Sequence, residues 1–373
     1  MRIRDVKVTL VEVPLEQVFK GGTYQIDKRC TVIVTLETDE GITGETYSGD
    51  ERDSYRGIRD LIMGPFRDVL VGEDPFAIER IWHRLFELTP NTGKPNIGSK
   101  EVAMRAISAV DLALWDVIGK ALNMPLYKLL GGAKQELPII GYGYYQAEDE
   151  VEAIAGLMVQ HKEMGYAGTK LKVGATSIEE DLRRVEAIRR AVGDEFILAC
   201  DANMAWTTEQ AIAFARGAQD YKLAWLEEPV RWYDQMEGMR KVREATTVPV
   251  TAGQSEHSGF GCMELMRRGA VDFLNVDASI AGGVTEWRRI AAAAHYFGVG
   301  MVHHEEPQVA VHLLSAIPHS FCAELFPDPK RDPVWHYMYP GHPEPRDGKI
   351  SPPEEPGLGI HIDWDFVRKY QVS

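Results

Sequence analysis

The chain has 373 residues, of which 45% are hydrophobic and 26% charged, and it carries a formal net charge of −15. This composition is that of an ordinary globular protein and excludes a disordered, collagenous or disulfide-rich chain. Because the charge is acidic and no basic stripe is present, we expect no nucleic acid among its partners. No apolar run reaches membrane-spanning length and the N-terminus lacks an apolar signal segment, so we expect a cytoplasmic protein without a membrane partner.

The N-terminal third predicts an α+β domain. Alternation of apolar and polar residues predicts three strands, at 6–13, 30–36 and 44–48. Apolar residues at helical spacing then predict helices within 53–70, 75–88 and 100–122. Residues 16–29 contain a Gly-Gly pair and are predicted to form an exposed loop, which is either a lid over a substrate or a plain hairpin connection.

From residue 137 onward, a short apolar segment rich in β-forming residues recurs every 22 to 31 residues. Eight strands are predicted, at 137–142, 168–173, 196–200, 223–226, 248–252, 273–276, 299–302 and 321–325. Amphipathic stretches such as 178–192 and 207–219 separate them, and this alternation indicates a parallel sheet that closes into a (β/α)8 barrel. A doubly wound open sheet is the alternative, but the GxGxxG motif expected after its first strand is absent.

Ionisable or amide side chains follow seven successive predicted strands. In chain order they are Lys170 and Lys172, Asp201 and Asn203, Glu227 and Glu228, Gln254 and Glu256, Asp277, His303 and His304, and Glu324. Active sites of such barrels lie at the C-terminal ends of the strands. One charged residue after a strand is ordinary loop chemistry, but seven in succession predict a functional site on this rim.

The acidic members of this set predict a metal site. Carboxylates that converge from neighbouring strands repel each other, so their convergence requires a cation. Oxygen ligands from Asp201, Glu227 and either Gln254 or Glu256 favour Mg2+ as the cofactor. Zinc is disfavoured because no His or Cys cluster accompanies these residues.

Two candidate bases, Lys172 and His304, are expected on different sides of the barrel mouth. Alternation places Lys170 and Lys172 on one face, so each ammonium is expected to lower the pKa of the other and let Lys172 lose its proton near neutral pH. Alternation also points His304 inward and His303 outward against a helix, and Asp277 is predicted to bond the second ring nitrogen of His304. A metal that faces two bases suits removal of a proton α to a carboxylate, because the cation stabilises the ene-diolate that develops.

Six segments, together with Glu324, carry a family resemblance over nearly the whole chain. They are ALWDVIGKALNMPLYKLLGG (113–132), KLK (170–172), DAN (201–203), EEP (227–229), DASIAGGVTEW (277–287) and HHEEPQ (303–308). In these segments the chain resembles the mandelate racemase branch of the enolase superfamily. The resemblance implies a modified TIM barrel of the (β/α)7β type at 131–326 and an α+β capping domain at 1–130. It also implies that a C-terminal tail at 327–373 completes the capping domain and that the 16–29 loop closes over the substrate.

The resemblance also implies catalytic roles. Lys172 matches the family's base on one face of the substrate, and His304, supported by Asp277, matches the catalyst on the other face. Lys170 tunes Lys172 and contacts the substrate carboxylate. Glu324 matches an electrophilic or hydrogen-bonding group that contacts the substrate from the last strand.

The same comparison implies metal and substrate ligands. Asp201 and Glu227 match the first two metal ligands, and Asn203 matches a residue that contacts a substrate or ligand oxygen. Gln254 stands where a third carboxylate is usual. Glu256 replaces it if the strand end bulges, whereas Gln254 itself offers an uncharged amide oxygen, and the sequence leaves this choice open.

The predicted function is dehydration of an acid sugar to a 2-keto-3-deoxy acid by a Mg2+-dependent lyase, because the HHEEPQ context resembles the acid-sugar dehydratases. Two alternatives remain: a racemase or epimerase of a 2-hydroxy acid or related carboxylate, and a non-catalytic barrel that binds a metal or a sugar acid. The aromatic stretch 142–146 suits a polyol or, equally, plain packing. The expected partners are a small acid sugar or hydroxy acid and, given the size of the chain, further copies of itself.

Overall fold

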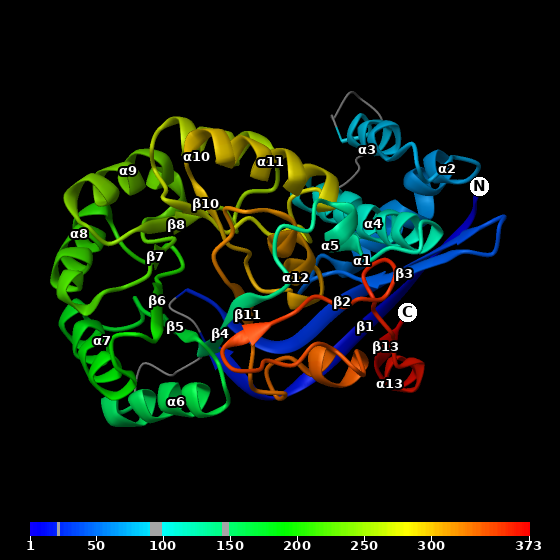
Figure 1. Cartoon of the computed structure of the whole chain (residues 1–373). Coiled ribbons are helices and arrows are strands. Elements are labelled where there is room, and N and C mark those ends of the chain that lie inside the picture. Colours follow the sequence, from blue (N-terminus) through cyan, green and yellow to red (C-terminus); the bar gives the residue numbers. More distant parts are fainter. Residues whose placement is uncertain (21–22, 90–98, 144–148) are drawn as a thin grey trace.

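The computed structural model describes residues 1–20, 23–89, 99–143 and 149–373, and these form two sheets (Figure 1). The first is antiparallel, with the order β13-β1-β2-β3. Its strands are β1 (Ile3–Lys20), β2 (Gln25–Thr38), β3 (Thr43–Tyr47) and β13 (Gln371–Val372). The three strands that the sequence predicted in the N-terminal third are therefore present, and β1 and β2 are longer than expected.

The lengthening of β1 and β2 corrects the prediction of an exposed loop at 16–29. Residues on both sides of the turn pair across an antiparallel hairpin, with Phe19 opposite Ile26 and Lys20 opposite Gln25. Phe19 and Ile26 are buried, but charged neighbours conceal this alternation in the sequence. The segment is thus a hairpin, whose residues Thr23 and Tyr24 line the cavity described below, and its closure over a substrate stays a prediction. Residues 21–22 lie outside the described part of the chain.

Helices cover one face of this sheet. They are α1 (Tyr55–Leu61), α2 (Arg67–Leu70), α3 (Ile78–Phe86) and α4 (Lys100–Ala121), with a π-helical turn at Ile62–Phe66. The helix predicted over 53–70 is broken at Gly64–Pro65, because Gly64 is non-helical and proline has no N–H to donate. Helix α4 packs against β2, β3 and helix α11 of the barrel, so it forms the main contact between the two sheets' domains.

The second sheet is parallel and curls into a barrel (Figure 1). Its strands are β4 (Leu137–Gly143), β5 (Gly168–Lys172), β6 (Ile197–Asp201), β7 (Leu226–Glu227), β8 (Val250–Ala252), β9 (Phe273–Leu274), β10 (Gly300–Met301) and β11 (Ala323–Leu325). They follow the order β10-β9-β8-β7-β6-β5-β4-β11. Backbone hydrogen bonds from Met301 to His319 and from Phe321 to Met301, of 3.0 and 2.8 Å, join β10 to the segment that enters β11. The predicted barrel of parallel strands is confirmed.

A helix follows each barrel strand from β4 to β10 and lies on the outside of the sheet (Figure 1). These helices are α6 (Val151–Glu163), α7 (Ile178–Val192), α8 (Thr208–Gly217), α9 (Gln235–Ala245), α10 (Gly259–Arg267), α11 (Gly283–Phe297) and α12 (Pro307–Ala316). Local signals set their starts: Ser177 caps α7, and Thr207 and Gln210 form a capping box at α8. Short helices α5 (Leu126–Leu129) and α13 (Trp364–Tyr370) flank the barrel segment.

The C-terminal segment contacts both sheets. Strand β12 (Lys349–Ile350) pairs antiparallel with β4, and β13 pairs with β1 at Leu10 and Val11. The last residues of the chain thus complete the N-terminal sheet. The domain boundaries at 130 and 326 stay a prediction. None of the helices in the described ranges is long and apolar enough to cross a membrane.

Candidate active site

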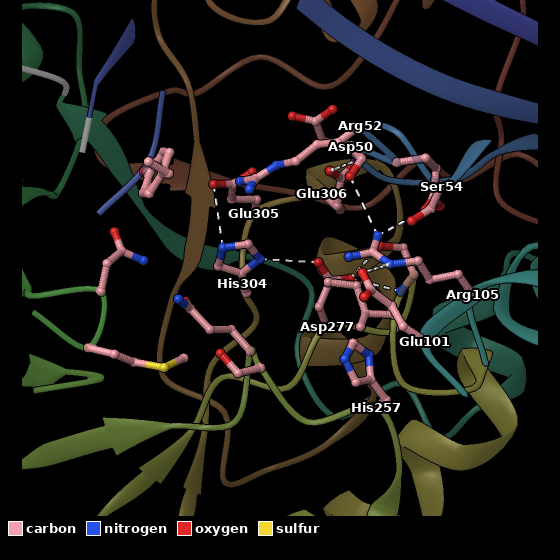
Figure 2. A pocket seen from close by; sticks show the side chains of 18 of the residues that line it. Asp50, Arg52, Ser54, Glu101, Arg105, His257, Asp277, His304, Glu305 and Glu306 are labelled. Carbon is pink, nitrogen blue, oxygen red and sulfur yellow. Dashed lines mark hydrogen bonds and ion pairs between the residues drawn. The ribbon is translucent and has the colours of Figure 1, made fainter. Parts of the chain in front are cut away.

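A cavity of about 480 Å³ lies at the C-terminal ends of the barrel strands. The barrel and the N-terminal domain both line it (Figure 2). Of the residues that the sequence singled out, Lys172, Asn203, Gln254, Asp277 and His304 line the cavity. Four others are fully buried close to these and belong to the same cluster: Lys170, Asp201, Glu227 and Glu324.

Lys172 lies between two polar side chains of the next strand end. Its Nζ donates to Asp201 Oδ2 at 2.6 Å and to Asn203 Oδ1 at 2.5 Å. The parallel register explains the first contact, because Lys172 of β5 stands opposite Asp201 of β6. Burial raises the pKa of Asp201, but attraction from Lys172 and Lys170 outweighs it and lowers the pKa to about 2. Asp201 is therefore a carboxylate at any physiological pH.

Lys170 is bonded to two buried carboxylates. Its Nζ lies 2.8 Å from Glu227 Oε1 and 2.6 Å from Glu324 Oε1. Burial lowers the pKa of Lys170, but attraction from Glu227, Glu324 and Asp201 outweighs burial and the repulsion from Lys172, so the pKa is raised. Lys172 therefore lowers the pKa of Lys170 as expected, but the two carboxylates in direct contact outweigh this effect. Lys170 is a fixed cation.

Tyr142, at the end of β4, joins these two groups of charges. Its hydroxyl donates to Asp201 Oδ2 at 2.9 Å. The Nζ atoms of Lys170 and Lys172 lie 4.3 and 4.7 Å from the centre of its ring, which is the range of cation–π attraction. The sequence indicated this position only through the aromatic stretch 142–146, of which 144–146 lies outside the described residues.

His304 and Asp277 form the contact that the sequence predicted. His304 Nδ1 lies 3.2 Å from Asp277 Oδ2, and Asp277 Oδ1 accepts from the backbone N–H and hydroxyl of Ser279 at 2.7 Å each. The other ring nitrogen, Nε2, lies 3.4 Å from Glu305 Oε1 (Figure 2). Burial lowers the pKa of His304, but Glu305 and Asp277 outweigh it and raise the pKa to about 9. His304 is an imidazolium at neutral pH.

His303 points the other way, as strand alternation predicted. Its side chain is fully buried, and its ring centre lies 6.5 Å from that of Trp287 in α11. Its Nε2 accepts from the Ala278 N–H at 3.0 Å. His303 therefore packs against a helix and supports the loop that carries Asp277.

Gln254 and Glu256, the two candidates for the third metal ligand, lie in different surroundings. Gln254 lines the cavity, and its Oε1 accepts from Asn275 Nδ2 at 3.2 Å. The Glu256 carboxylate instead lies over Gly261 of α10, where a Cβ atom would come within 1.6 Å of Oε2. The glycine at 261 is what makes room for Glu256 there. Gln254 is thus the better placed of the two to face a ligand in the cavity.

The donor set fits a hard divalent cation. Among the described residues, no three His, Cys, Asp or Glu side chains are arranged to hold a metal ion, because Asp201 and Glu227 face lysines and position 254 is an amide. The carboxylates are nevertheless crowded. Burial raises the pKa of Glu227 to about 7 against the attraction of Lys170, with Asp201 and Glu324 adding to the rise. Oxygen-only ligands under such mutual repulsion are what Mg2+ binds and relieves.

The N-terminal domain supplies cavity residues that the sequence did not single out individually, although Tyr24 belongs to the 16–29 segment. Arg105 of α4 donates to Glu51 Oε2 at 2.9 Å and to Glu101 Oε1 at 3.2 Å. Tyr24 directly precedes β2, and its ring centre is 5.3 Å from Lys172 Nζ. These residues come from separate elements of the other domain, so no spacing in the sequence relates them to the strand ends.

A buried ion cluster connects the two domains behind the cavity. Arg29 of β2 lies 3.0 Å from Glu306, 3.1 Å from Asp332 and 3.6 Å from Asp50. Glu306 and its neighbour Glu305 both have φ of 47°, in the left-handed region that non-glycine residues avoid. The Arg29 cluster therefore holds the strained turn that follows His304.

Comparison with known proteins agrees with this fold. Residues 3–131 match the model of the mandelate racemase/muconate lactonizing enzyme N-terminal domain, and residues 153–366 match that of the enolase C-terminal domain-like family. A mandelate racemase/muconate lactonizing enzyme from a marine actinobacterium, solved in complex with magnesium, is 40% identical. It covers 100% of this chain and 99% of its own, with a TM-score of 0.92.

Two curated relatives cover the whole chain at 30% identity. They are an L-talarate/galactarate dehydratase of Salmonella typhimurium, of which 92% is covered, and a 3,6-anhydro-alpha-L-galactonate cycloisomerase of Streptomyces coelicolor, of which 100% is covered. The fold and these matches define an enzyme of the enolase superfamily. Within it, the chain belongs to the mandelate racemase/muconate lactonizing enzyme family, so the resemblance read from the sequence is confirmed.

Proposed function

We propose that the protein is a Mg2+-dependent acid-sugar dehydratase that forms a 2-keto-3-deoxy acid. The observation that carries the proposal is the pair of groups on the cavity wall, the Lys172 amine from β5 and the His304–Asp277 pair from β10 and β9. In the barrel, β5 and β10 are separated by at least two strands. A substrate between them is therefore exposed to a base on one side and an acid on the other.

In the proposed reaction, Asp201, Glu227 and Gln254 would hold Mg2+, which would supply charge stabilisation for the substrate carboxylate. The Lys170 ammonium lies among these carboxylates and hydrogen-bonds the same substrate group. The Nζ of Lys172 accepts the proton from the α-carbon, and Asn203 orients this Nζ. Glu324 positions Lys170 from the last strand.

His304 completes the elimination. Its imidazolium donates a proton to the β-hydroxyl, which leaves as water, while Asp277 keeps the ring oriented through Nδ1. The enol that remains takes a proton from solvent at the β-carbon and becomes the 2-keto-3-deoxy acid. Atoms balance, because the acid sugar loses one molecule of water and nothing is oxidised or reduced.

The charge state of His304 is the one that dehydration requires. Glu305 and Asp277 raise the pKa of His304 to about 9 against the effect of burial, so its imidazolium is available to protonate the leaving hydroxyl. The same imidazolium would protonate the α-carbon in one direction of a racemase, so the choice of dehydration is tested by the reaction product. The related enzymes support the same choice in part, since they include arabinonate, galactarate and D-xylonate dehydratases beside a cycloisomerase and a dipeptide epimerase.

The test is a panel of acid sugars with Mg2+, with 2-keto products detected by semicarbazide and α-proton exchange followed by NMR in D2O. We expect a keto product from at least one acid sugar, abolished by Lys172→Ala. In His304→Asn, exchange of the α-proton is expected to persist while keto product is lost. Exchange or epimerisation without a keto product in the unmodified enzyme would assign a racemase instead, and neither reaction on any panel member would favour a binding protein.

A further inference from the structure

The cavity has a second wall, formed by the N-terminal domain, whose charges bear on the far end of the substrate. Its charged members are Asp50, Glu51, Arg52, Glu101 and Arg105. In Figure 2, Glu101 and Arg105 lie on the side of Asp277 that faces away from His304. A substrate whose carboxylate lies at the strand ends and whose β-hydroxyl lies at His304 therefore extends its remaining carbons toward this wall.

The buried arginine of this wall, Arg105, is already paired with carboxylates of the protein. Arg105 is hydrogen-bonded to Glu51 and Glu101, and its side chain is only 12% exposed. Two carboxyl groups thus share one guanidinium, and Glu51 is fully buried at the pair. A carboxylate arriving from the substrate would have to displace one of them or face both.

The buried Arg29, behind this wall, is also paired with carboxylates of the protein. It forms ion pairs with Asp50, Glu306 and Asp332. The two guanidiniums, Arg29 and Arg105, thus face five carboxylates of the protein. A third buried arginine, Arg331, lies over the Phe326 ring, and its charge, like those of His304 and Arg29, helps to lower the pKa of Glu305.

Arg52, the remaining cation of the wall, is exposed. Its guanidinium lies 5.3 Å from the centre of the Tyr24 ring at the edge of the cavity. Water and salt screen such a charge within about 10 Å, so it compensates little of the buried negative charge.

The same wall offers a hydrogen-bond acceptor without a partner. Asp50 Oδ2 is buried and has no donor among the described residues, and the Asp50 side chain, which is 8% exposed, lines the cavity. On the barrel side of the cavity, His257 Nδ1 is likewise buried and has no described partner. A hydroxyl group satisfies such an oxygen by donating its proton, whereas a carboxylate has no proton to donate.

We infer that the substrate is a monocarboxylic acid sugar, an aldonate, whose far end carries hydroxyl groups, and that this wall rejects the dicarboxylic aldarates. The inference rests on the proposed dehydratase function and narrows its substrate class. Asp50 accepts a substrate hydroxyl, and the excess of carboxylates around Arg105 repels a second substrate carboxylate. Rejection by unpaired like charge is a recognised route to specificity.

The experiment compares pairs of acid sugars that differ only in the terminal carbon, D-gluconate with D-glucarate and D-galactonate with galactarate, together with the five-carbon pair D-xylonate and xylarate. For the pair whose stereochemistry the enzyme accepts, we expect kcat/KM to be at least about tenfold higher for the aldonate. Calorimetric binding to the Mg2+-loaded protein provides a second readout, and the aldonate is expected to bind more tightly by a similar factor.

Two variants of the N-terminal domain, each lacking one negative charge, distinguish an effect of the cavity wall from an effect of the protein's net charge. Glu101→Gln relieves Arg105 of one carboxylate at a side chain that is 45% exposed, so the fold tolerates it, and the aldonate-to-aldarate ratio is expected to fall at least about threefold. Glu87→Gln removes the same charge at an exposed position away from the cavity and should leave the ratio unchanged. Equal or better use of the aldarate, or a ratio that Glu101→Gln does not change, would overturn this inference and leave the dehydratase intact. Failure of every pair to react or bind would overturn the proposed function and this inference with it.

Discussion

The two walls of the cavity stabilise their buried charges through different kinds of ion pair. On the barrel side, lysines and carboxylates stand on neighbouring strands, so that Lys170 meets Glu227 and Lys172 meets Asp201 across a regular parallel register. On the N-terminal side, Arg29 and Arg105 each collect carboxylates from distant segments. The first arrangement brings together groups that can hold and move a proton. The second joins segments of both domains through ion pairs, and its carboxylates outnumber its buried guanidiniums, which is the basis of the inferred substrate selection.

The strongest test of the barrel wall is removal of Lys172. Lys172→Ala deletes the proposed base, and we expect α-proton exchange to fall by about 10⁴-fold, the upper range for a positioned acid or base. Solvent exchange followed by NMR measures this loss. Lys128→Ala, at a 49% exposed position, is the matched control and should retain full exchange. A Lys172→Ala variant with unchanged melting temperature and more than a tenth of the exchange rate would remove Lys172 from the mechanism.

The N-terminal wall is tested through stability. Arg29→Met leaves Glu306, Asp332 and Asp50 buried without their cation, and we expect the free energy of unfolding to fall by about 3–5 kcal/mol. Urea denaturation measures the difference. Arg59→Met, at a 31% exposed ion pair on α1, is expected to cost less than about 1 kcal/mol. Equal effects of the two substitutions would show that the cluster does not hold the domains together.

The difference between the walls also explains which site residues could be predicted from the sequence. Strand alternation and strand order place Lys172, Asp201, Asp277 and His304 on one rim, because residues at successive parallel strand ends are neighbours in any such barrel. Arg105 becomes a cavity residue only through the packing of α4 against the barrel, which no local pattern encodes.

The errors have similar physical causes. Residues 16–29 resemble a loop because charged side chains interrupt the alternation, yet backbone pairing across the hairpin outweighs local propensity. The pKa of Lys170 depends on distances to Glu227 and Glu324 that spacing alone does not provide. The choice between Gln254 and Glu256 likewise depends on where the Glu256 side chain finds room, over Gly261.

The charge state of His304 provides a second test of the barrel wall, through the pH dependence of the reaction. Its pKa of about 9 lies above the ordinary value of 6.5, so kcat/KM for dehydration should fall tenfold per pH unit above about 9. Because the folded-state pKa is raised, the stability that His304 contributes is fully present below pH 6.5 and is lost as the pH rises through 9. In Asp277→Asn the alkaline limb should move to lower pH. A profile without this alkaline limb, or one that Asp277→Asn does not move, would contradict the assignment of His304 as the acid.

The smallest expected effect concerns the third metal ligand. Gln254→Ala is expected to weaken Mg2+ binding about tenfold, whereas Glu256→Gln, whose side chain lies over Gly261, should leave it within about twofold. Titration of the chelator-treated protein with Mg2+, followed calorimetrically, measures both. The reverse order would make Glu256 the ligand and require the end of β8 to rearrange.

The most direct test of the proposed reaction is the position of deuterium in the product. When an accepted aldonate is converted in D2O with Mg2+, base removal of the α-proton followed by loss of the β-hydroxyl requires a 2-keto-3-deoxy acid that carries solvent deuterium at C3. We expect NMR to show this product, with none formed by His304→Asn. Recovery of the starting acid or its C2 epimer with deuterium at C2, and no keto product, would contradict the assignment of His304 as the acid that expels water.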